Sequence, residues 1–377
     1  MTDVGGQKRG IISAIRADLR DVKPYAAVEP PERLAEKAGI PRDSVLKLDA
    51  NENPFGCSPK VAPALAGYDR YHIYPDPISA ESRELVARYV GVDPERIVIG
   101  NGSDEIIDLV FRLFVGHGEV IVSCPPTFGY YSASAASCGG TLRNVPRNPS
   151  FEVDVPAILS QLDASVKVIA IASPNNPTGN CIAEDDLVRL LDTGTVVLID
   201  EAYAEFSGKS FIPLSGTYDN LIVARTFSKW AGLAGVRAGY GVFSRILVDY
   251  IMKIKPPYNV SVAAQVAVNA SLDDLDYLQD KINRIVAERE RLLTDLGRFS
   301  FLQPHPSEAN FILCTMTEGD VAEWRTKLES RGIFFRYYDD PRLRDCLRIS
   351  IGTPEQNDRV LATLREFGQA TLLPTDV

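Results

Sequence analysis

Residues 224–241 are Ala-Arg-Thr-Phe-Ser-Lys-Trp-Ala-Gly-Leu-Ala-Gly-Val-Arg-Ala-Gly-Tyr-Gly, and they follow directly on the apolar run Leu221–Val223. The stretch holds one lysine, Lys229, among small and hydroxyl residues, with Arg237 eight positions later. A lysine that attacks a carbonyl must lose its proton near neutral pH, and a nearby cation at a partly desolvated site favours that loss. Lys229 and Arg237 fit this requirement; the alternative is an exposed Ser-Lys pair followed by glycine turns.

The bulk composition excludes several classes of protein. The chain has 377 residues, enough for a large and a smaller domain, and its formal net charge of −10 disfavours binding to nucleic acid or to anionic membranes. Six cysteines without Cys-x-x-Cys spacing and only three histidines predict no metal site. No apolar run approaches the length of a membrane span. We therefore expect a cytoplasmic protein in a reducing compartment.

Short apolar runs recur from Arg96 onward, with helical stretches between several of them. They cover residues 96–99, 119–123, 166–172, 195–199, 221–225 and 238–243. Continuous apolar strands that alternate with helices are typical of a mostly parallel sheet covered by helices on both faces. The predicted fold class is therefore α/β.

A polar cluster follows five of these runs. The clusters are Gly100–Glu105, Cys124–Gly129, Ser173–Gly179, Asp200–Tyr203 and Thr226–Lys229. In open α/β sheets, ligands bind outside the carboxyl ends of the strands. The common placement of the clusters predicts one shared ligand site at that edge of the sheet.

The first cluster suits an anion. Gly102-Ser103 stands at a strand-to-helix turn, where free helix N-terminal amides can bind a phosphate. Ser103 could also act as an ordinary N-cap through its side chain. The pair Gly100-x-Gly102 is too short for a dinucleotide fingerprint, which needs a third glycine and a later acidic residue. A Rossmann dehydrogenase is therefore a poor fit.

The chain from residue 245 onward has a different pattern. A long charged helix near 273–297 carries apolar residues at three-and-four spacing with a gap at Arg289, and Thr353 with Gln356 predicts a capping box. The remaining predicted elements are strands at 309–315, 333–338 and 346–351 and helices near 318–330 and 354–367. We predict an arm at 1–50 that packs on the small domain or a partner subunit, a large site-bearing domain at 51–260 and a small α+β domain at 261–377.

Three motifs together resemble the pyridoxal-phosphate aminotransferases of the aspartate-aminotransferase fold. They are Asn175-Asn-Pro-Thr-Gly179, Asp200-Glu-Ala-Tyr203, and Ser228-Lys229 followed by Arg237. Further motifs resemble the histidinol-phosphate aminotransferases: Val22-Lys-Pro-Tyr25, Leu48-Asp-Ala-Asn-Glu-Asn-Pro54, Tyr74-Pro-Asp-Pro77, Cys124-Pro-Pro-Thr127 and Cys346-Leu-Arg-Ile349. The resemblance runs from about residue 22 to 370. The chain departs from it at Phe128, where relatives often carry tyrosine, and at Ala26-Ala-Val-Glu29, which replaces a glycine-containing turn.

The resemblance implies pyridoxal 5′-phosphate as cofactor and a role for each site residue. Lys229 would bond covalently to the cofactor and move the substrate's α-proton, and Asp200 would pair with the pyridinium nitrogen. The resemblance further places Asn176 and Tyr203 on the ring's 3′-oxygen and Phe128 and Ala202 on its two faces. The phosphate ligands would be the backbone N–H groups of Ser103 and Asp104, the hydroxyls of Thr226 and Ser228, and Arg237.

The resemblance also implies the substrates and the assembly. Arg348 would bind the amino donor's carboxylate together with Asn176, and Arg336 the anionic end of the substrate. Tyr74 would reach the phosphate from the neighbouring subunit of a homodimer. The implied reaction converts histidinol phosphate and 2-oxoglutarate to imidazole acetol phosphate and glutamate, a step of histidine biosynthesis.

Other functions compete with this one. An aromatic amino-acid aminotransferase or a phosphothreonine-type decarboxylase of the same fold would keep the lysine, the aspartate and the arginines. A non-catalytic sensing domain of a transcription regulator would need a basic DNA-binding module, and the first 50 residues have neither the length nor the charge for one.

Overall fold

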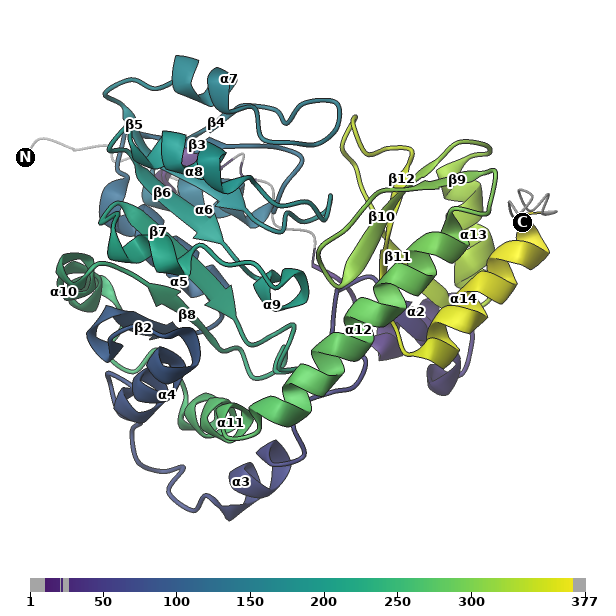
Figure 1. The fold of residues 1–377 in the computed structure, drawn as a ribbon, viewed down its shortest axis with the longest axis horizontal. Helices are drawn as coiled ribbons and strands as arrows, with labels where there is room; N and C mark the ends of the chain where they lie inside the picture. Colours follow the sequence, from purple (N-terminus) through teal and green to yellow (C-terminus); the bar gives the residue numbers. More distant parts are fainter. Residues whose placement is uncertain (1–10, 21, 23–26, 369–377) are drawn as a thin grey trace, which may run out of the picture.

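The computed structural model describes residues 11–20, 22 and 27–368. Within these residues the chain forms two sheets, each packed against helices (Figure 1). Lys23, Pro24 and Tyr25 of the first predicted motif, and Ala26 after it, lie outside the described residues.

The large sheet is mostly parallel, as predicted. Its order is β2-β8-β7-β6-β5-β3-β4, and only β8 runs antiparallel to its neighbours. The bounds are β2 Ile97–Gly100, β3 Val120–Ser123, β4 Thr141–Asn144, β5 Val166–Ala172, β6 Val196–Asp200, β7 Leu221–Thr226 and β8 Gly239–Val242. Because β8 is reversed between β7 and β2, the carboxyl ends of β2, β3, β5, β6 and β7 meet at one edge.

Helices cover both faces of the large sheet, which explains why its strands, apart from the edge strand β4, are mostly apolar. Ile169 and Ile171 pack into one hydrophobic cluster, while the alternating residues Val168 and Ala170 pack into another. The helices on the first face are α3 Val61–Gly67, α4 Ala80–Val90, α7 Val155–Ser160, α8 Glu184–Leu191 and α11 Val262–Leu272. Those on the second face are α5 Ser103–Phe114, α6 Tyr130–Cys138 and α10 Arg245–Ile254.

The second sheet is smaller and mostly antiparallel. Its order is β1-β11-β12-β10-β9, and only the pair β1 with β11 is parallel. The bounds are β1 Leu46–Leu48, β9 Leu302–Pro304, β10 Phe311–Met316, β11 Ile333–Tyr337 and β12 Cys346–Ser350. The helices around it are α2 Pro31–Ala38, α13 Val321–Ser330 and α14 Pro354–Phe367. The predicted capping box of Thr353 and Gln356 at the start of α14 is confirmed.

The helix α12, Leu275–Leu296, runs from α11 to the second sheet (Figure 1). Its apolar stripe is interrupted at Arg289, yet this side chain is buried on the same face. Arg289 Nη1 donates to the carbonyl oxygens of Phe206 and Ala309, at 3.2 and 3.1 Å. The arginine therefore joins α9, Ala204–Ser207, to the segment that enters β10, and this explains the gap in the apolar pattern.

The division into domains stays a prediction, although two elements bear on it. The helix α11 packs on α3 and α4 beside the large sheet, and β1, within the predicted arm, belongs to the second sheet. The short elements that remain are α1 Ile11–Ala14 and 3₁₀ turns at Ala17–Leu19, Arg42–Ser44, Pro94–Arg96 and Ile212–Gly216.

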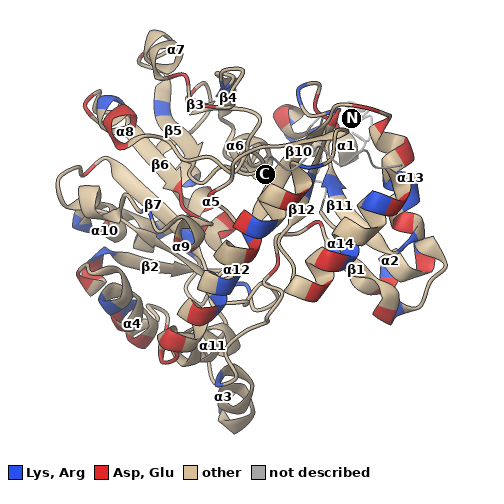
Figure 2. Ribbon diagram, turned by 45° about the vertical axis from the view of Figure 1, so that its right-hand side comes forward, with Lys and Arg blue, Asp and Glu red and all other residues tan. Residues whose placement is uncertain are grey.

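Acidic and basic residues are interspersed on the outer helices α12, α13 and α14 (Figure 2). This mixture is typical of helix faces that meet water. In the described parts of the chain, no helix is both long and apolar enough to span a bilayer.

Candidate active site

One pocket of about 610 Å³ is lined by residues from both sheets and the loops that follow their strands. All the predicted site residues except Tyr74 line it: Ser103, Asp104, Phe128, Asn176, Asp200, Ala202, Tyr203, Thr226, Ser228, Lys229, Arg237, Arg336 and Arg348. The five polar clusters therefore meet in one place, as their common position at strand ends predicts.

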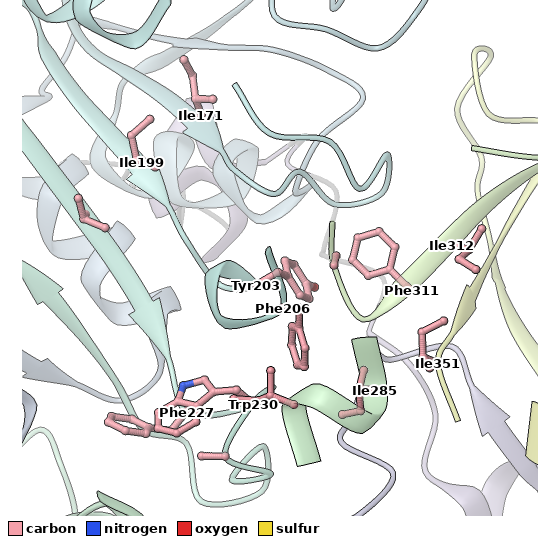
Figure 3. Packing of buried hydrophobic residues seen from close by; sticks show 14 of the residues in the cluster. Ile171, Ile199, Tyr203, Phe206, Phe227, Trp230, Ile285, Phe311, Ile312 and Ile351 are labelled. Carbon is pink, nitrogen blue, oxygen red and sulfur yellow. The ribbon is translucent and has the colours of Figure 1, made fainter. Parts of the chain in front are cut away.

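Lys229 is anchored by its neighbours. Phe227 and Trp230 are buried in the core with ring centroids 5.6 Å apart, and this packing fixes the backbone on both sides of the lysine (Figure 3). The Lys229 Nζ atom lines the pocket and donates to the carbonyl oxygen of Ala50 at 3.0 Å. Burial, and next the charge of Arg348, lower the pKa of Lys229 to about 8. The amine is thus partly neutral near pH 8, as a nucleophile requires.

A set of hydrogen-bond donors converges beside Lys229. The hydroxyl of Thr226 bonds that of Ser228 at 2.9 Å, and Arg237 Nη1 lies 3.5 Å from the Ser228 hydroxyl. The second guanidinium nitrogen, Nη2, pairs with the carboxylate of Asp104 at 2.9 Å. Together with the first amides of α5, these groups can surround a phosphate.

The predicted N-cap role of the Ser103 side chain is wrong. The helix begins at Ser103 itself, and Gly102 is the N-cap, with φ of 83° and no side-chain bond. A Cβ atom on Gly102 would lie 2.7 Å from Arg237 Nη2, and one on Gly239 would lie 2.5 Å from the Ser103 nitrogen. Glycine at both positions therefore keeps the helix terminus and the guanidinium close together.

Asp200 is the last residue of β6, with only 4% of its surface exposed. Its carboxylate accepts hydrogen bonds from the Tyr131 hydroxyl and the Ala202 N–H, each at 3.1 Å. Among the described residues, no lysine or arginine forms an ion pair with it. Burial raises the pKa of Asp200 to about 6. A buried carboxylate in this state is suited to a cationic N–H group of a ligand.

A buried ion cluster fastens the strand ends that carry the site. Arg225 of β7 donates to Glu201 at 2.8 and 2.7 Å and to Glu205 at 3.0 Å. Glu201 follows Asp200, and Arg225 precedes Thr226. Because both acids bind one guanidinium, the cluster holds the ends of β6 and β7 in register.

Side chains for the two faces and one edge of a flat ligand also lie here. Phe128 packs edge-on against Tyr131, with centroids 5.7 Å apart, and Ala202 lines the pocket. The Tyr203 ring packs edge-on against Phe311 at 5.1 Å (Figure 3). Asn176 accepts a hydrogen bond from Arg348, so its side chain faces the second sheet.

Two arginines reach the pocket from the second sheet. Arg336 of β11 and Arg348 of β12 are register partners. Arg348 is buried and donates to Asn176 and to the carbonyl oxygen of Asp49, while its Nε has no hydrogen-bond partner. A buried guanidinium with an unused N–H group can bind an oxyanion.

Tyr74 is the one predicted site residue outside the pocket. It is 77% exposed and stacks on Tyr258, with ring centroids 4.5 Å apart. Within this chain it contributes nothing to the pocket.

Tyr131 and Asn51 are among the polar residues of the site that were missed from the sequence. Tyr131 bonds Asp200, and its only signal is its position three residues after Phe128, within helical reach. Asn51 lines the pocket and bonds Tyr203 at 3.0 Å. It stands in the motif Leu48–Pro54, which contributes to the resemblance but from which no site residue is predicted.

Comparisons with known proteins agree with this geometry. The sequence profile of the family Aminotransferase class I and II matches residues 43–364. Histidinol-phosphate aminotransferase of Roseiflexus castenholzii is 49% identical over 365 residues, which cover 94% of this chain and 98% of that protein. The protein of the same name from Dehalococcoides mccartyi is 44% identical over 355 residues, with the same shares covered.

Solved structures show the same fold. Histidinol-phosphate aminotransferase from Sinorhizobium meliloti, in complex with pyridoxal-5′-phosphate, has a TM-score of 0.81 at 28% identity, covering 90% of this chain and 95% of that one. L-threonine-O-3-phosphate decarboxylase from Porphyromonas gingivalis has a TM-score of 0.75 at 21% identity, which shows a shared fold alone. The chain therefore belongs to the class I and II aminotransferases, and within them to the histidinol-phosphate aminotransferases.

Proposed function

We propose that this chain transfers the amino group of histidinol phosphate to 2-oxoglutarate, with pyridoxal 5′-phosphate as cofactor, in histidine biosynthesis. The observation that carries the proposal is the pocket itself, where a lysine with a lowered pKa lies between a phosphate-sized set of donors and a buried carboxylate. The two arginines of the second sheet supply the cations that an anionic amino donor needs.

The residues present fit the cofactor. Asp200 would hold the protonated ring nitrogen, because the buried carboxylate gains a cationic partner there. The phosphate would be held by the amides of Ser103 and Asp104, the hydroxyls of Thr226 and Ser228, and the guanidinium of Arg237. Arg237 would then bind the phosphate instead of the Asp104 carboxylate. Bound cofactor supplies an aldehyde for the lysine amine and a ring that accepts electrons.

The ring would be fixed on all sides by this chain. Phe128 would cover one face and Ala202 the other, while Asn176 and Tyr203 would bind its 3′-oxygen. Lys229, once released by the incoming amino donor, would take the proton from the donor's α-carbon and deliver it to the C4′ carbon of the cofactor. The partly neutral amine supports this role as a base.

The same two arginines would bind both substrates. One pocket must accept histidinol phosphate, which has a phosphate, and glutamate, which has carboxylates. A guanidinium fork matches either oxyanion, so Arg348 and Arg336 suit both half-reactions. Asn176, which accepts from Arg348, would help to orient it.

The assembly and location belong to the proposal as well. A homodimer would bring Tyr74 of one subunit to the phosphate in the other; its exposed position outside the pocket of its own chain supports this arrangement. The protein would be cytoplasmic.

Steady-state rates test the proposal directly. Histidinol phosphate, phenylalanine and phosphothreonine would each be supplied with 2-oxoglutarate. The highest kcat/KM is expected for histidinol phosphate. Faster transamination of phenylalanine would favour an aromatic aminotransferase, and loss of carbon dioxide from phosphothreonine would favour a decarboxylase.

A further inference from the structure

Asn51 lies at the junction of the two sheets and is almost completely buried, with 1% of its surface exposed. Its side-chain amide, Nδ2, donates to the Tyr203 hydroxyl at 3.0 Å. Its Oδ1 accepts from the Ser350 hydroxyl at 2.9 Å. The Asn51 side chain thus connects Tyr203, beside the large sheet, to Ser350 at the end of β12, two residues after Arg348.

The hydrogen bonds of Ser350 fix which way the Asn51 carboxamide points. The backbone N–H of Asn51 donates to the Ser350 oxygen at 2.9 Å, so the serine's own hydrogen needs another acceptor in this buried place. Asn51 Oδ1 is that acceptor. The amide nitrogen therefore faces Tyr203, and it can only donate.

This orientation determines what the Tyr203 phenol can do. Because Asn51 donates to the phenol oxygen, the phenol hydrogen must be directed to a different acceptor. The ring is held by its edge-on packing against Phe311, so only the hydroxyl hydrogen remains to be oriented (Figure 3). Tyr203 lines the pocket, and the other acceptor would be an oxygen of the ligand there.

The backbone of Asn51 is held as firmly as its side chain. Its φ of 54° lies in the left-handed region, which asparagine tolerates better than most residues other than glycine. The Asn310 amide donates to the Asn51 carbonyl oxygen at 3.0 Å. The two preceding carbonyls are used too, since that of Asp49 accepts from Arg348 and that of Ala50 from Lys229.

We propose that Asn51 is a positioning residue: its carboxamide, held by Ser350, directs the Tyr203 hydrogen toward the 3′-oxygen of the bound cofactor. The inference rests on the proposed function, because it concerns the state of the cofactor ring. A hydrogen bond donated to that oxygen stabilises its anionic form. Without it, the proton shared between this oxygen and the lysine nitrogen is harder to remove, and the visible absorbance of the holoenzyme changes at a higher pH.

The test is a spectral pH titration of holoenzyme variants without amino donor. Asn51→Gly keeps the left-handed backbone and removes the carboxamide, whereas Asn51→Asp keeps the shape and removes the donor. Both are expected to raise the titration midpoint by about one pH unit, the size of one charge-assisted hydrogen bond. The double variant with Tyr203→Phe should shift no further than Tyr203→Phe alone. In turnover, kcat should fall about tenfold with KM for histidinol phosphate little changed.

Asn310→Ala is the matched control, since Asn310 binds only the Asn51 backbone in this network. Thermal melting should show its destabilisation without a spectral shift. An Asn51→Asp midpoint equal to that of the wild type, or an equal shift in Asn310→Ala, would overturn the inference, because shape or general loosening would then explain the effect. A wild-type protein with no visible band would instead refute the proposed function.

Discussion

At the scale of single residues, Lys229 is the sharpest prediction. With a pKa of about 8, half of its amine is neutral at pH 8, against roughly 0.3 per cent for an ordinary lysine. Borohydride reduction of the holoenzyme should therefore label one peptide, the one that contains Lys229. Lys229→Ala should carry no label, while the exposed Lys253→Ala should be labelled like the wild type. Mass spectrometry that finds the label on Lys253 or Lys255 would refute the assignment.

Asp200 can be tested both with and without cofactor. In the holoenzyme, Asp200→Ala should lower kcat more than tenfold, or about 1.4 kcal/mol of barrier, because a neutral ring is a poor electron acceptor. Activity within tenfold of the wild type would make Asp200 structural.

In the cofactor-free protein, replacing Asp200 should be favourable, because it should raise stability at neutral pH. Burial raises the pKa of Asp200 from 3.8 to about 6, so the folded state binds the proton more tightly than the unfolded state. Protonated Asp200 therefore contributes to the free energy of unfolding. This contribution is fully present below pH 4 and is lost as the pH rises through 6, by about 3 kcal/mol for two pKa units. Asp200→Asn should therefore unfold at higher denaturant concentration than the wild type at pH 7.5 and equally at pH 4. Denaturant titrations that find no such pH dependence would contradict the assignment of the pKa.

The sequence predicted motif residues that line the pocket, but it did not predict residues whose importance comes from a distant hydrogen-bond partner. Asp200 stands directly after the apolar run 195–199 and Lys229 four residues after the end of the run 221–225, so their positions follow from the ends of strands. Tyr131 and Asn51 matter only through hydrogen bonds to residues far away in the chain. No spacing predicts such contacts.

At the scale of elements, the register of β11 with β12 places Arg336 beside Arg348. Arg336→Ala should lower kcat/KM for histidinol phosphate by roughly 10- to 150-fold, the cost of a lost charge-assisted hydrogen bond. The loss with phenylalanine should be less than about threefold, because its side chain has no anion to bind. Arg344→Ala is the matched control, since that arginine is exposed and pairs with Asp345. Equal losses for both substrates would favour an aromatic aminotransferase.

Arg348→Lys should impair both half-reactions. A lysine keeps the charge but loses the fork that bonds Asn176 and the Asp49 carbonyl at once. Stopped-flow absorbance of each half-reaction would measure the loss. An effect on the histidinol phosphate half-reaction alone would show that Arg348 does not bind the carboxylates of glutamate.

Strands with continuous apolar runs were predictable, and the short or polar ones were not. The strands β1 and β9 have three residues each, and β4 is an edge strand with exposed Thr141 and Asn144. Such strands exist because a neighbour offers a free edge, and this is a property of the folded sheet. Arg289 shows the reverse case, where a charged residue occupies an apolar stripe because two carbonyls lie within its reach.

At the scale of the whole molecule, we expect a homodimer. Tyr71, Ile73 and Tyr74 expose their side chains on one loop beside Tyr258, and an aromatic surface of this kind favours burial against a partner. Light scattering should give twice the mass of the chain. Mixing Tyr74→Ala with Lys229→Ala, each nearly inactive alone, should restore part of the activity through hybrid dimers. A monomeric mass at working concentration would refute the shared site.

The parallel pairing of Leu46–Leu48 with Ile333–Phe335 has a consequence for the order in which the protein is completed. A ribosome releases the chain from its N-terminus, so all strands of the large sheet are available once Val242 has emerged. The strand β1 then still lacks its neighbour, and Arg348 has not been made. At ordinary rates of synthesis, roughly 5 to 20 seconds separate residue 242 from residue 350. The residues of the large sheet that surround Lys229 are therefore synthesised before Arg336 and Arg348.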